Sequence, residues 1–270
     1  MSKPILFLLA ACAALTAGLS GCSKVAMSGR SQLNFIPDGE IMSMSYQQYE
    51  QVVKESKLSS DSVQVRRVRN VGKRIQRAVE DYFAAAGNSA HLKDYKWEFN
   101  LIESEDVNAW CMPGGKVAFY TGILPVCKDD AGIAVVMGHE VAHAVAEHGA
   151  ERMSQSLLAE MGGMALSAAL ANEPQQTQAL WMTAFGVGAQ YGALLPFSRT
   201  QESEADHLGL VFMAMAGYDP QVAVAFWQRM SAQGGGSIPE FMSTHPSDET
   251  RIRKIQEYLP EAQKAYRPAP

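Results

Sequence analysis

The sequence predicts an α+β fold that is predominantly helical and contains one small β-sheet. Apolar residues over 61–86 recur at three- and four-residue steps, the period of an amphipathic helix. Residues 95–102 alternate apolar and polar positions, and residues 115–120 form a second short apolar run, as strands do. Residues 131–147 are apolar nearly all round, so we expect a buried helix there.

The first 21 residues have the features of an export signal. Lys3 gives a positive start, and residues 5–17 form an apolar segment too short to span a bilayer comfortably. The segment ends in Leu-Ser-Gly-Cys, which resembles a bacterial lipobox, so we expect cleavage before Cys22 and acylation of that residue. A plain secretory signal cut nearby is the alternative. Acyl chains on Cys22 would hold the chain at the periplasmic face of the bacterial envelope, and Ser23 favours the outer membrane.

The mature chain is expected to begin with a tether over 22–37, followed by a helix over 40–57. The helix over 61–86 is capped by Ser60 or Asp61, and its polar face carries six basic residues. That face is either simply solvated or suited to an anionic lipid surface.

Residues 103–113 are expected to be a loop between the two strands. Two helices rich in Ala, Gly and Met follow the buried helix, over 155–171 and 176–195. The second is apolar enough to resemble a membrane segment, but glutamines interrupt it. We therefore favour a helical cover over the site, with a hairpin that dips into the membrane as the alternative.

The C-terminal part is expected to be helical as well. Helices are predicted over 199–216, 219–232 and 247–259. A flexible glycine link at 234–236 and a loose tail over 261–270 complete this part. The pattern contains no internal repeat, so we expect residues 38–260 to form a single domain.

Charge and cysteine content narrow the possible partners. The net charge is −5, and it becomes −6 once Lys3 leaves with the signal. Since no basic patch is interleaved with aromatic residues, nucleic acid is not an expected partner. Cys111 and Cys127 remain in the mature chain, where an oxidising periplasm allows a disulfide, and two free thiols are the alternative. Neither belongs to a C-x-x-C pair, so we expect neither to bind zinc.

The buried helix contains His139-Glu140-Val141-Ala142-His143, which matches H-E-x-x-H. Side chains four positions apart lie on one face of a helix, so the two imidazoles can hold one Zn²⁺. The carboxylate of Glu140 can then reach a water on the metal and act as general base. Two solvated histidines on an ordinary helix are the alternative. The apolar flanks argue against it, because buried His and Glu are costly unless something pairs them.

A third zinc ligand must come from elsewhere in the chain. Glu202 and Asp206 lie four residues apart on the helix predicted over 199–216 and share a face, whereas Glu204 lies on the opposite side. We expect Glu202 to bind zinc and Asp206 to accept a hydrogen bond from a ligating imidazole, which fixes that histidine's tautomer. An acidic surface helix has the same spacing and is the alternative.

Five motifs follow one another along the mature chain. They are Ser28-Gly29-Arg30-Ser31-Gln32-Leu33, Val107-Asn108-Ala109 with Pro113-Gly114-Gly115, the H-E-x-x-H stretch, Arg199-x-x-Glu202-x-Glu204-Ala205-Asp206, and Thr244-His245-Pro246-Ser247 with Arg251-Ile252. In this order they resemble the HtpX-type zinc metallopeptidases, and within them the bacterial members most like the mitochondrial overlapping-activity protease. Together they are far more specific than any single motif.

The resemblance implies a zincin-like (gluzincin) metalloprotease domain with its small sheet beside the active-site helix. It makes Glu202 the zinc ligand, in agreement with the spacing. It also implies that His245 lies near the metal, where it blocks the site at rest or stabilises the oxyanion, and that Arg251 can donate to the same oxyanion. His91, His148 and His207 receive no role.

The substrate-edge motifs place Asn108, Ala109, Gly115, Lys116 and Val117 beside the substrate. We expect an extended substrate to add a strand along 115–120, which only an unfolded polypeptide can do. The expected function is therefore a zinc-dependent endopeptidase that cleaves misfolded or exposed polypeptides in the cell envelope. A zinc-bound chaperone or assembly factor with little or no proteolysis is the alternative.

Overall fold

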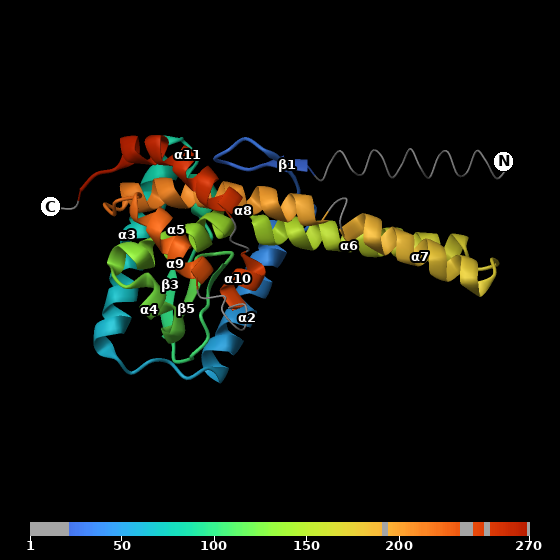
Figure 1. The fold of residues 1–270 in the computed structure, drawn as a ribbon, viewed down its shortest axis with the longest axis horizontal. Coiled ribbons are helices and arrows are strands. Elements are labelled where there is room, and N and C mark those ends of the chain that lie inside the picture. The colour runs from blue at the N-terminus through green and yellow to red at the C-terminus, as the bar shows by residue number, and fades with distance from the viewer. Residues whose placement is uncertain (1–21, 191–193, 233–239, 246–248, 269–270) are drawn as a thin grey trace. The chain divides into compact units, whose positions relative to one another are not determined.

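The computed structural model describes residues 22–190, 194–232, 240–245 and 249–268 (Figure 1). The expected export signal over 1–21, the glycine link at 234–236 and the Pro246-Ser247 part of the last motif lie outside the described residues. The described part is mostly helical with small β-sheets, as the sequence predicts.

The chain divides into two compact units. The larger contains Ile41–His148 and Arg199–Pro270, and the smaller contains Met1–Glu40 and Gly149–Ser198. The single domain expected over 38–260 stays a prediction. The segment 149–198 groups with the N-terminal segment rather than with the helix that carries the H-E-x-x-H stretch.

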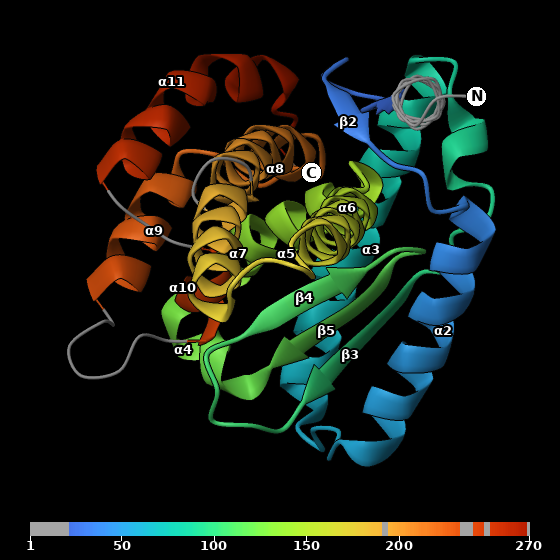
Figure 2. The same ribbon diagram turned by 90° about the vertical axis from the view of Figure 1, so that its right-hand side faces the viewer.

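The larger unit contains a three-stranded sheet (Figure 2). Its strands are β3 (Glu98–Ile102), β4 (Ala109–Met112) and β5 (Lys116–Tyr120), in the order β3-β5-β4. β5 pairs in parallel with β3 and antiparallel with β4, so both of its sides are occupied. The expectation that a substrate adds a strand along 115–120 is therefore wrong. Residues 109–112, which we expected in a loop, form an edge strand because they pair with β5.

Two helices pack on this sheet and on each other. α3 (Ser62–Ala85) begins at Asp61, whose side chain accepts hydrogen bonds from the backbone N–H groups of Val63 and Gln64 at 2.9 and 3.1 Å. Its buried face packs against β3 and against α5 (Asp130–Val145), and α5 also packs against β4. Every residue of α5 beyond its first two is buried, in agreement with its apolar sequence. The core of the larger unit therefore lies where α3, α5 and the sheet meet.

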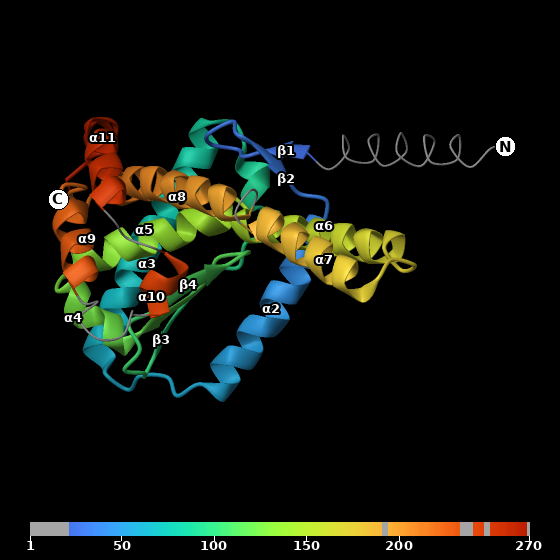
Figure 3. The same cartoon turned by 45° about the vertical axis from the view of Figure 1, so that its right-hand side comes forward.

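α8 (Leu195–Met215) lies against α5 (Figure 3), and the two helices are in contact at one glycine of each. A Cβ atom on Gly138 of α5 would lie 2.6 Å from the backbone oxygen of Gly209 of α8, and one on Gly209 would lie 2.8 Å from the backbone nitrogen of His139. Only glycine lets two helix backbones approach this closely. This contact brings the acidic segment of α8 beside the H-E-x-x-H stretch.

Further helices complete this part of the fold. They are α2 (Asp38–Glu55), η1 (Ser89–Leu92), η2 (Thr121–Ile123), α4 (Leu124–Cys127), α9 (Val222–Ala232), α10 (Glu240–Thr244) and α11 (Glu249–Ala265). α11 continues through Pro260, so the loose tail expected over 261–270 is wrong for its first five residues. Proline removes one hydrogen-bond donor, but the full burial of Ala262 holds the following turn in place.

The smaller unit contains an antiparallel strand pair where we expected a tether. β1 (Cys22–Lys24) pairs with β2 (Ser31–Leu33), and Gly29 in the connection has a φ of 71°, a conformation that favours glycine. Arg30 donates two hydrogen bonds of 2.8 Å to the carboxylate of Glu151 on α6 (His148–Ala169). The residues after Cys22 therefore form a hairpin that an ion pair ties to α6.

α6 and α7 (Gln175–Ala189) lie side by side (Figure 1, Figure 3). A Cβ atom on Gly162 of α6 would lie 3.0 Å from the ring of Phe185 of α7, so the two helices are in close contact there. Both helices expose large apolar side chains. These include Leu157, Leu158, Met161, Met164, Leu180, Trp181 and Val187. Within the described part of the chain, no helix combines the length and the apolar character that crossing a membrane requires.

Candidate metal centre

His139, Glu140 and His143 lie on α5 and are all buried. The Nε2 atoms of the two histidines face each other at 3.1 Å, which follows from their four-residue spacing. α5 begins after Asp129, whose side chain accepts a hydrogen bond of 2.8 Å from the backbone of Gly132. Because the helix is capped and buried along its length, the two imidazoles have defined positions.

Two further side chains join the histidines. Glu202 comes from α8, and its oxygens lie 3.4 Å from His139 Nε2 and 3.3 Å from His143 Nε2. His245 directly follows α10, and its Nδ1 lies 2.9 Å from Glu202 Oε2 and 3.2 Å from His139 Nε2. One ligand atom from each of the four residues lies within 4.8 Å of the other three. Imidazole nitrogens and a carboxylate are the donors that Zn²⁺ accepts in proteins.

The chemistry of this cluster fits a bound cation. Glu202 Oε1 is buried, and it makes no hydrogen bond to any described residue although the His143 imidazole lies 3.3 Å from it. Lone pairs on nitrogen and oxygen that face one another repel unless a proton or a metal ion lies between them. Burial without such a partner is costly. One divalent ion held by the cluster would satisfy all of these atoms together.

Without a metal ion, the protonation states of His139, His143 and Glu202 depend on their burial and on the charged side chains around them. Burial lowers the pKa of His139, but hydrogen bonds with Asp206 and Glu202 outweigh burial and raise the pKa to about 9. Burial holds the pKa of His143 well below its usual value. Burial raises the pKa of Glu202, but His143 and hydrogen bonds with the histidines reverse this and hold it well below the usual range. At neutral pH Glu202 is therefore an anion, and His139 is the protonated member of the histidine pair.

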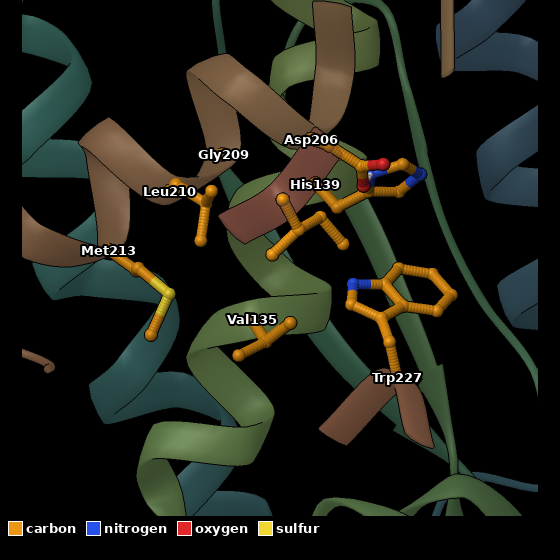
Figure 4. Close-up of a pocket in the computed structure, with 8 residues that line it drawn as sticks. Val135, His139, Asp206, Gly209, Leu210, Met213 and Trp227 are labelled. Atoms are coloured by element: carbon orange, nitrogen blue, oxygen red, sulfur yellow. Dashed lines mark ion pairs between the residues drawn. The ribbon is translucent and has the colours of Figure 1, made fainter. Parts of the chain in front are cut away.

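Asp206 lies at the Nδ1 side of the His139 ring (Figure 4). Its Oδ1 is 3.0 Å from His139 Nδ1, which leaves Nε2 of that ring for the cluster. The pKa of Asp206 is lowered despite burial, chiefly by the charge of Arg251 and the hydrogen bond with His139. The structure thus brings Asp206 to the position that its spacing from Glu202 indicated.

Arg251 lies on α11 and is buried. It donates from Nε and Nη2 to the two oxygens of Asp206 at 2.8 Å, and from Nη1 to the backbone oxygen of His245 at 3.0 Å. Its guanidinium also stacks on the Trp227 ring, with Cζ 3.5 Å from the ring centroid. Nη1 of Arg251 also lies 3.5 Å from Glu202 Oε2, so Arg251 supports Asp206 and the backbone of His245 at the border of the cluster, and its donation to the oxyanion stays a prediction.

A further histidine, His148, and a further carboxylate, Glu204, lie at the Nδ1 side of the His143 ring. His148 Nδ1 is 2.8 Å from His143 Nδ1, and His148 Nε2 is 3.0 Å from Glu204 Oε2. Sequence reasoning gave neither residue a role. Glu204 is on the opposite face of α8 from Glu202, and His148 follows His143 by five residues, a spacing that does not place two side chains together on a continuous helix. No local signal identifies this pair.

The residues expected to bind substrate lie on two neighbouring strands. Ala109 begins the edge strand β4 and Asn108 precedes it, whereas Lys116 and Val117 belong to the central strand β5 and Gly115 precedes that strand. The Lys116 ammonium pairs with Glu98 at 3.0 Å, and Val117 is fully buried. The positions around Asn108 and Ala109 are therefore the ones that the structure places at an edge of the sheet.

Cys111 on β4 and Cys127 at the end of α4 are free thiols. The disulfide that we considered is therefore not formed. Cys127 is buried in the core and Cys111 is partly exposed on the edge strand. Burial raises the pKa of both thiols, that of Cys127 to about 12, and the charge of Glu140 adds to the shift of Cys111. The influence of Glu140 on Cys111 is consistent with the packing of β4 against α5.

Comparisons with known proteins identify relatives of this chain. The family model described as Peptidase family M48 matches residues 70–259. The chain is 41% identical over 191 residues to the mitochondrial metalloendopeptidase OMA1 of Schizosaccharomyces pombe, a match that covers 70% of this chain and 53% of that protein. It is 31% identical over 246 residues to the metalloendopeptidase OMA1 of Bos taurus, which covers 88% of this chain and 46% of that protein. It is 28% identical over 174 residues to the beta-barrel assembly-enhancing protease of Escherichia coli, which covers 60% of this chain and 35% of that protein.

These matches agree with the resemblance carried by the five motifs. The matched residues 70–259 contain all four members of the candidate metal cluster. The chain spans about half of the length of the two OMA1 proteins and about a third of the length of the bacterial protease.

Proposed function

This chain belongs to peptidase family M48, and from that premise we propose that it is a zinc-dependent endopeptidase of the bacterial cell envelope. The observation that carries the proposal is the convergence of His139, His143, Glu202 and His245 on one buried point. The names of its relatives, metalloendopeptidase and protease, support the same reaction.

We propose His139, His143 and Glu202 as the residues that would hold the ion. Two imidazoles and one carboxylate are the protein ligands of many catalytic zinc sites, which keep a further position open. When bound, Zn²⁺ supplies the Lewis acidity that activates a water molecule and polarises the scissile carbonyl group. Asp206 holds the His139 ring in the orientation that directs Nε2 toward the cluster, and Arg251 holds Asp206 in place.

Glu140 is the proposed general base. It directly follows His139 on the buried helix α5, and its Oε1 lies 3.5 Å from His245 Nε2. Its carboxylate takes a proton from the attacking water and delivers it to the leaving amine. The peptide bond is then cleaved by water without a covalent bond between enzyme and substrate.

His245 is proposed to fill the fourth position of the resting site. Its Nδ1 lies among the ligand atoms while its Nε2 faces Glu140, so the ring stands where a water and a substrate carbonyl would need room. If the ring mainly blocks the site, His245→Ala should increase the rate of casein cleavage at unchanged zinc content. A decreased rate would instead make His245 a donor to the oxyanion.

The substrate is proposed to be an unfolded polypeptide segment that pairs with β4. β4 is an edge strand of the sheet and packs against α5, so an added strand would lie beside the helix that carries Glu140. This mode of binding requires an extended peptide. It supports a role in protein quality control, in which misfolded or exposed envelope polypeptides are cleaved.

Casein cleavage and zinc content, measured on the purified chain, test the proposal. Glu140→Gln should abolish cleavage while zinc stays bound, and Glu202→Ala should lower the zinc content. Glu173→Gln removes an exposed carboxylate from the smaller unit and is a matched control that should change neither quantity. Cleavage that persists in Glu140→Gln would refute the base, and unchanged zinc in Glu202→Ala would move the third ligand elsewhere.

Cys22 is proposed to carry the lipid anchor, with the protein at the periplasmic face of the envelope and on the outer membrane rather than the inner one. The Leu-Ser-Gly-Cys sequence supports this, as do the exposed apolar side chains of α6 and α7 in the unit that also contains Cys22. Cys22→Ala should release the chain from the membrane fraction. Retention of this variant would indicate that the apolar surface of α6 and α7 binds the membrane by itself.

A chaperone or assembly factor that binds zinc but cleaves little is the second candidate. The exposed apolar side chains of α6 and α7 favour it, because such a surface can hold unfolded polypeptide. The two functions are separated by complementation of a deletion strain. Glu140→Gln should fail to complement if proteolysis is the function, and full complementation would establish the chaperone.

A further inference from the structure

His148 and Glu204 form a buried chain of contacts that ends on His143. His148 is fully buried, and its two ring nitrogens lie 2.8 Å from His143 Nδ1 and 3.0 Å from Glu204 Oε2. The Glu204 side chain is only 7% exposed. The mechanism proposed above uses neither residue, although a buried imidazole between another imidazole and a carboxylate is a costly arrangement to keep without a purpose.

The backbone is bent to make this contact. On one continuous helix, residues five apart are separated by about 140° around the axis, so His148 could not face His143. α5 ends at Val145, and Glu147 takes a φ of 60°, a left-handed conformation that few residues other than glycine adopt. α6 then begins at His148. The strained turn therefore returns the imidazole of His148 onto the side of His143 that faces away from the cluster.

When a metal ion is bound, the protons of His143 and His148 can be placed in only one way that satisfies both rings and the Glu204 carboxylate. His143 Nε2 points to His139 Nε2 and to Glu202, so its lone pair is the one available to the ion. The proton of neutral His143 must then be on Nδ1, from which it is donated to His148 Nδ1. His148 carries its own proton on Nε2 and donates it to Glu204.

We propose that His148 and Glu204 are positioning residues that fix His143 as its Nδ1–H tautomer and thereby set the affinity and geometry of the metal site. His139 is held by a carboxylate directly, through Asp206, whereas His143 is held by a carboxylate through a second imidazole. Partners of this kind orient a ligating imidazole and increase its basicity. The inference rests on the proposed binding of zinc by His143.

Metal binding by the full chain tests this inference without relying on activity. Zn²⁺ affinity is measured by competition with a chelator, and ligand geometry by the visible absorption of the Co²⁺-loaded protein. His148→Leu should weaken Zn²⁺ binding about 10- to 100-fold and change the Co²⁺ spectrum. His148→Gln, whose amide can accept from His143 and donate to Glu204, should restore most of the affinity. Glu204→Gln keeps an acceptor but loses the charge, so its effect should be intermediate.

His207, which lies on α8 as Glu204 does, belongs to a pair that serves as a matched control. His207 and Glu261 form a pair of the same chemistry at 2.9 Å, which is exposed to solvent. His207→Leu and Glu261→Gln should leave both the affinity and the spectrum unchanged. In the zinc-loaded protein, nitrogen-15 NMR of the imidazoles should also show His143 with its proton on Nδ1.

The possible failures can be told apart. A wild-type chain that binds no zinc contradicts the proposed function. A wild-type chain that binds zinc while His148→Leu and Glu204→Gln bind it equally well contradicts only the positioning role of His148 and Glu204. Equal losses in His148→Leu and His148→Gln also overturn it, because the hydrogen bonds would then not be the cause. If His148→Leu does not fold, the comparison of His148→Gln, Glu204→Gln and the control variants decides.

Discussion

Asp206 has two partners that depend on its charge. It accepts from His139 Nδ1 and forms a two-pronged ion pair with the buried Arg251. Replacement of the carboxylate by an amide would keep an acceptor for His139 but would leave Arg251 as a buried cation facing a neutral group. Removing one partner of a buried pair is much more costly than the pair itself is stabilising.

Asp206→Asn is therefore expected to affect both stability and metal binding. The free energy of unfolding should fall by about 3–5 kcal/mol, as for other buried pairs that lose one charge. Zn²⁺ affinity should fall about 10- to 100-fold, because His139 loses its orienting carboxylate. Denaturant titration and chelator competition measure the two effects. A variant as stable as the parent would show that Arg251 finds another anion.

The raised pKa of His139 makes zinc binding pH-dependent. With a pKa of about 9, His139 is protonated in the metal-free protein at pH 7.5, and zinc binding at Nε2 must displace that proton. Calorimetry at pH 7.5 in two buffers of different ionisation enthalpy should therefore report release of about one proton from the protein. Release should vanish as the pH rises through about 9. No release at pH 7.5 would contradict the protonated state of His139.

The same pKa has a consequence for the stability of the metal-free chain. Since the folded-state pKa of about 9 lies above the usual value of 6.5, this histidine stabilises the fold fully below about pH 6.5. That contribution is lost as the pH rises through about 9.

At the scale of elements, the contact between α5 and α8 determines whether the ligands meet. Gly138 and Gly209 let the two backbones touch, and Glu202 and Asp206 lie on the same helix as Gly209, about two turns and one turn before it. Ligands on two helices can share an ion only while this distance holds. The glycines are thus as important to the site as the side chains that face it.

Gly138→Ala should weaken zinc binding although it changes no ligand. Its Cβ would lie 2.6 Å from the backbone oxygen of Gly209, so α8 must shift and carry Glu202 away from the histidines. We expect a loss of about 1–3 kcal/mol in stability together with reduced zinc content. Gly149→Ala, where no atom lies within 4 Å of the added Cβ, is the control. Unaltered zinc content in Gly138→Ala would show that this contact tolerates displacement.

Elements that depend on local signals were predictable, and those that depend on distant contacts were not. The Asp61 cap and the apolar period indicated α3, and the apolar run indicated α5. The positions of β4 and β5 follow from pairing between strands, which no local pattern encodes, so the free edge was assigned to the wrong strand. Likewise, Pro260 suggested the end of a helix that the burial of Ala262 in fact continues.

The site shows the same division between local and distant information. Four-residue spacing indicated that His139 and His143 face one point and that Glu202 and Asp206 share a face, and the structure brings these residues together. The family resemblance added His245. His148 and Glu204 were missed, because their contact with His143 depends on a left-handed turn at Glu147 that no spacing rule anticipates.

At the scale of the whole molecule, the chain consists of two units with different characters. The larger holds the cluster of buried ligands, and the smaller holds the N-terminal hairpin together with the apolar helices α6 and α7. We expect the first to carry the peptidase chemistry and the second to carry the contact with lipid or unfolded polypeptide. The proposed peptidase chemistry depends on the metal ion that the buried cluster would hold.

Zinc content and casein cleavage, measured on the same preparations of the wild-type chain and of Glu140→Gln, test that dependence most directly. We expect one Zn²⁺ per chain in both proteins. The wild type should cleave casein, a chelator should abolish this cleavage and added zinc should restore it, whereas Glu140→Gln should not cleave. A wild-type chain without stoichiometric metal, or cleavage that survives in Glu140→Gln, would contradict the proposed peptidase chemistry.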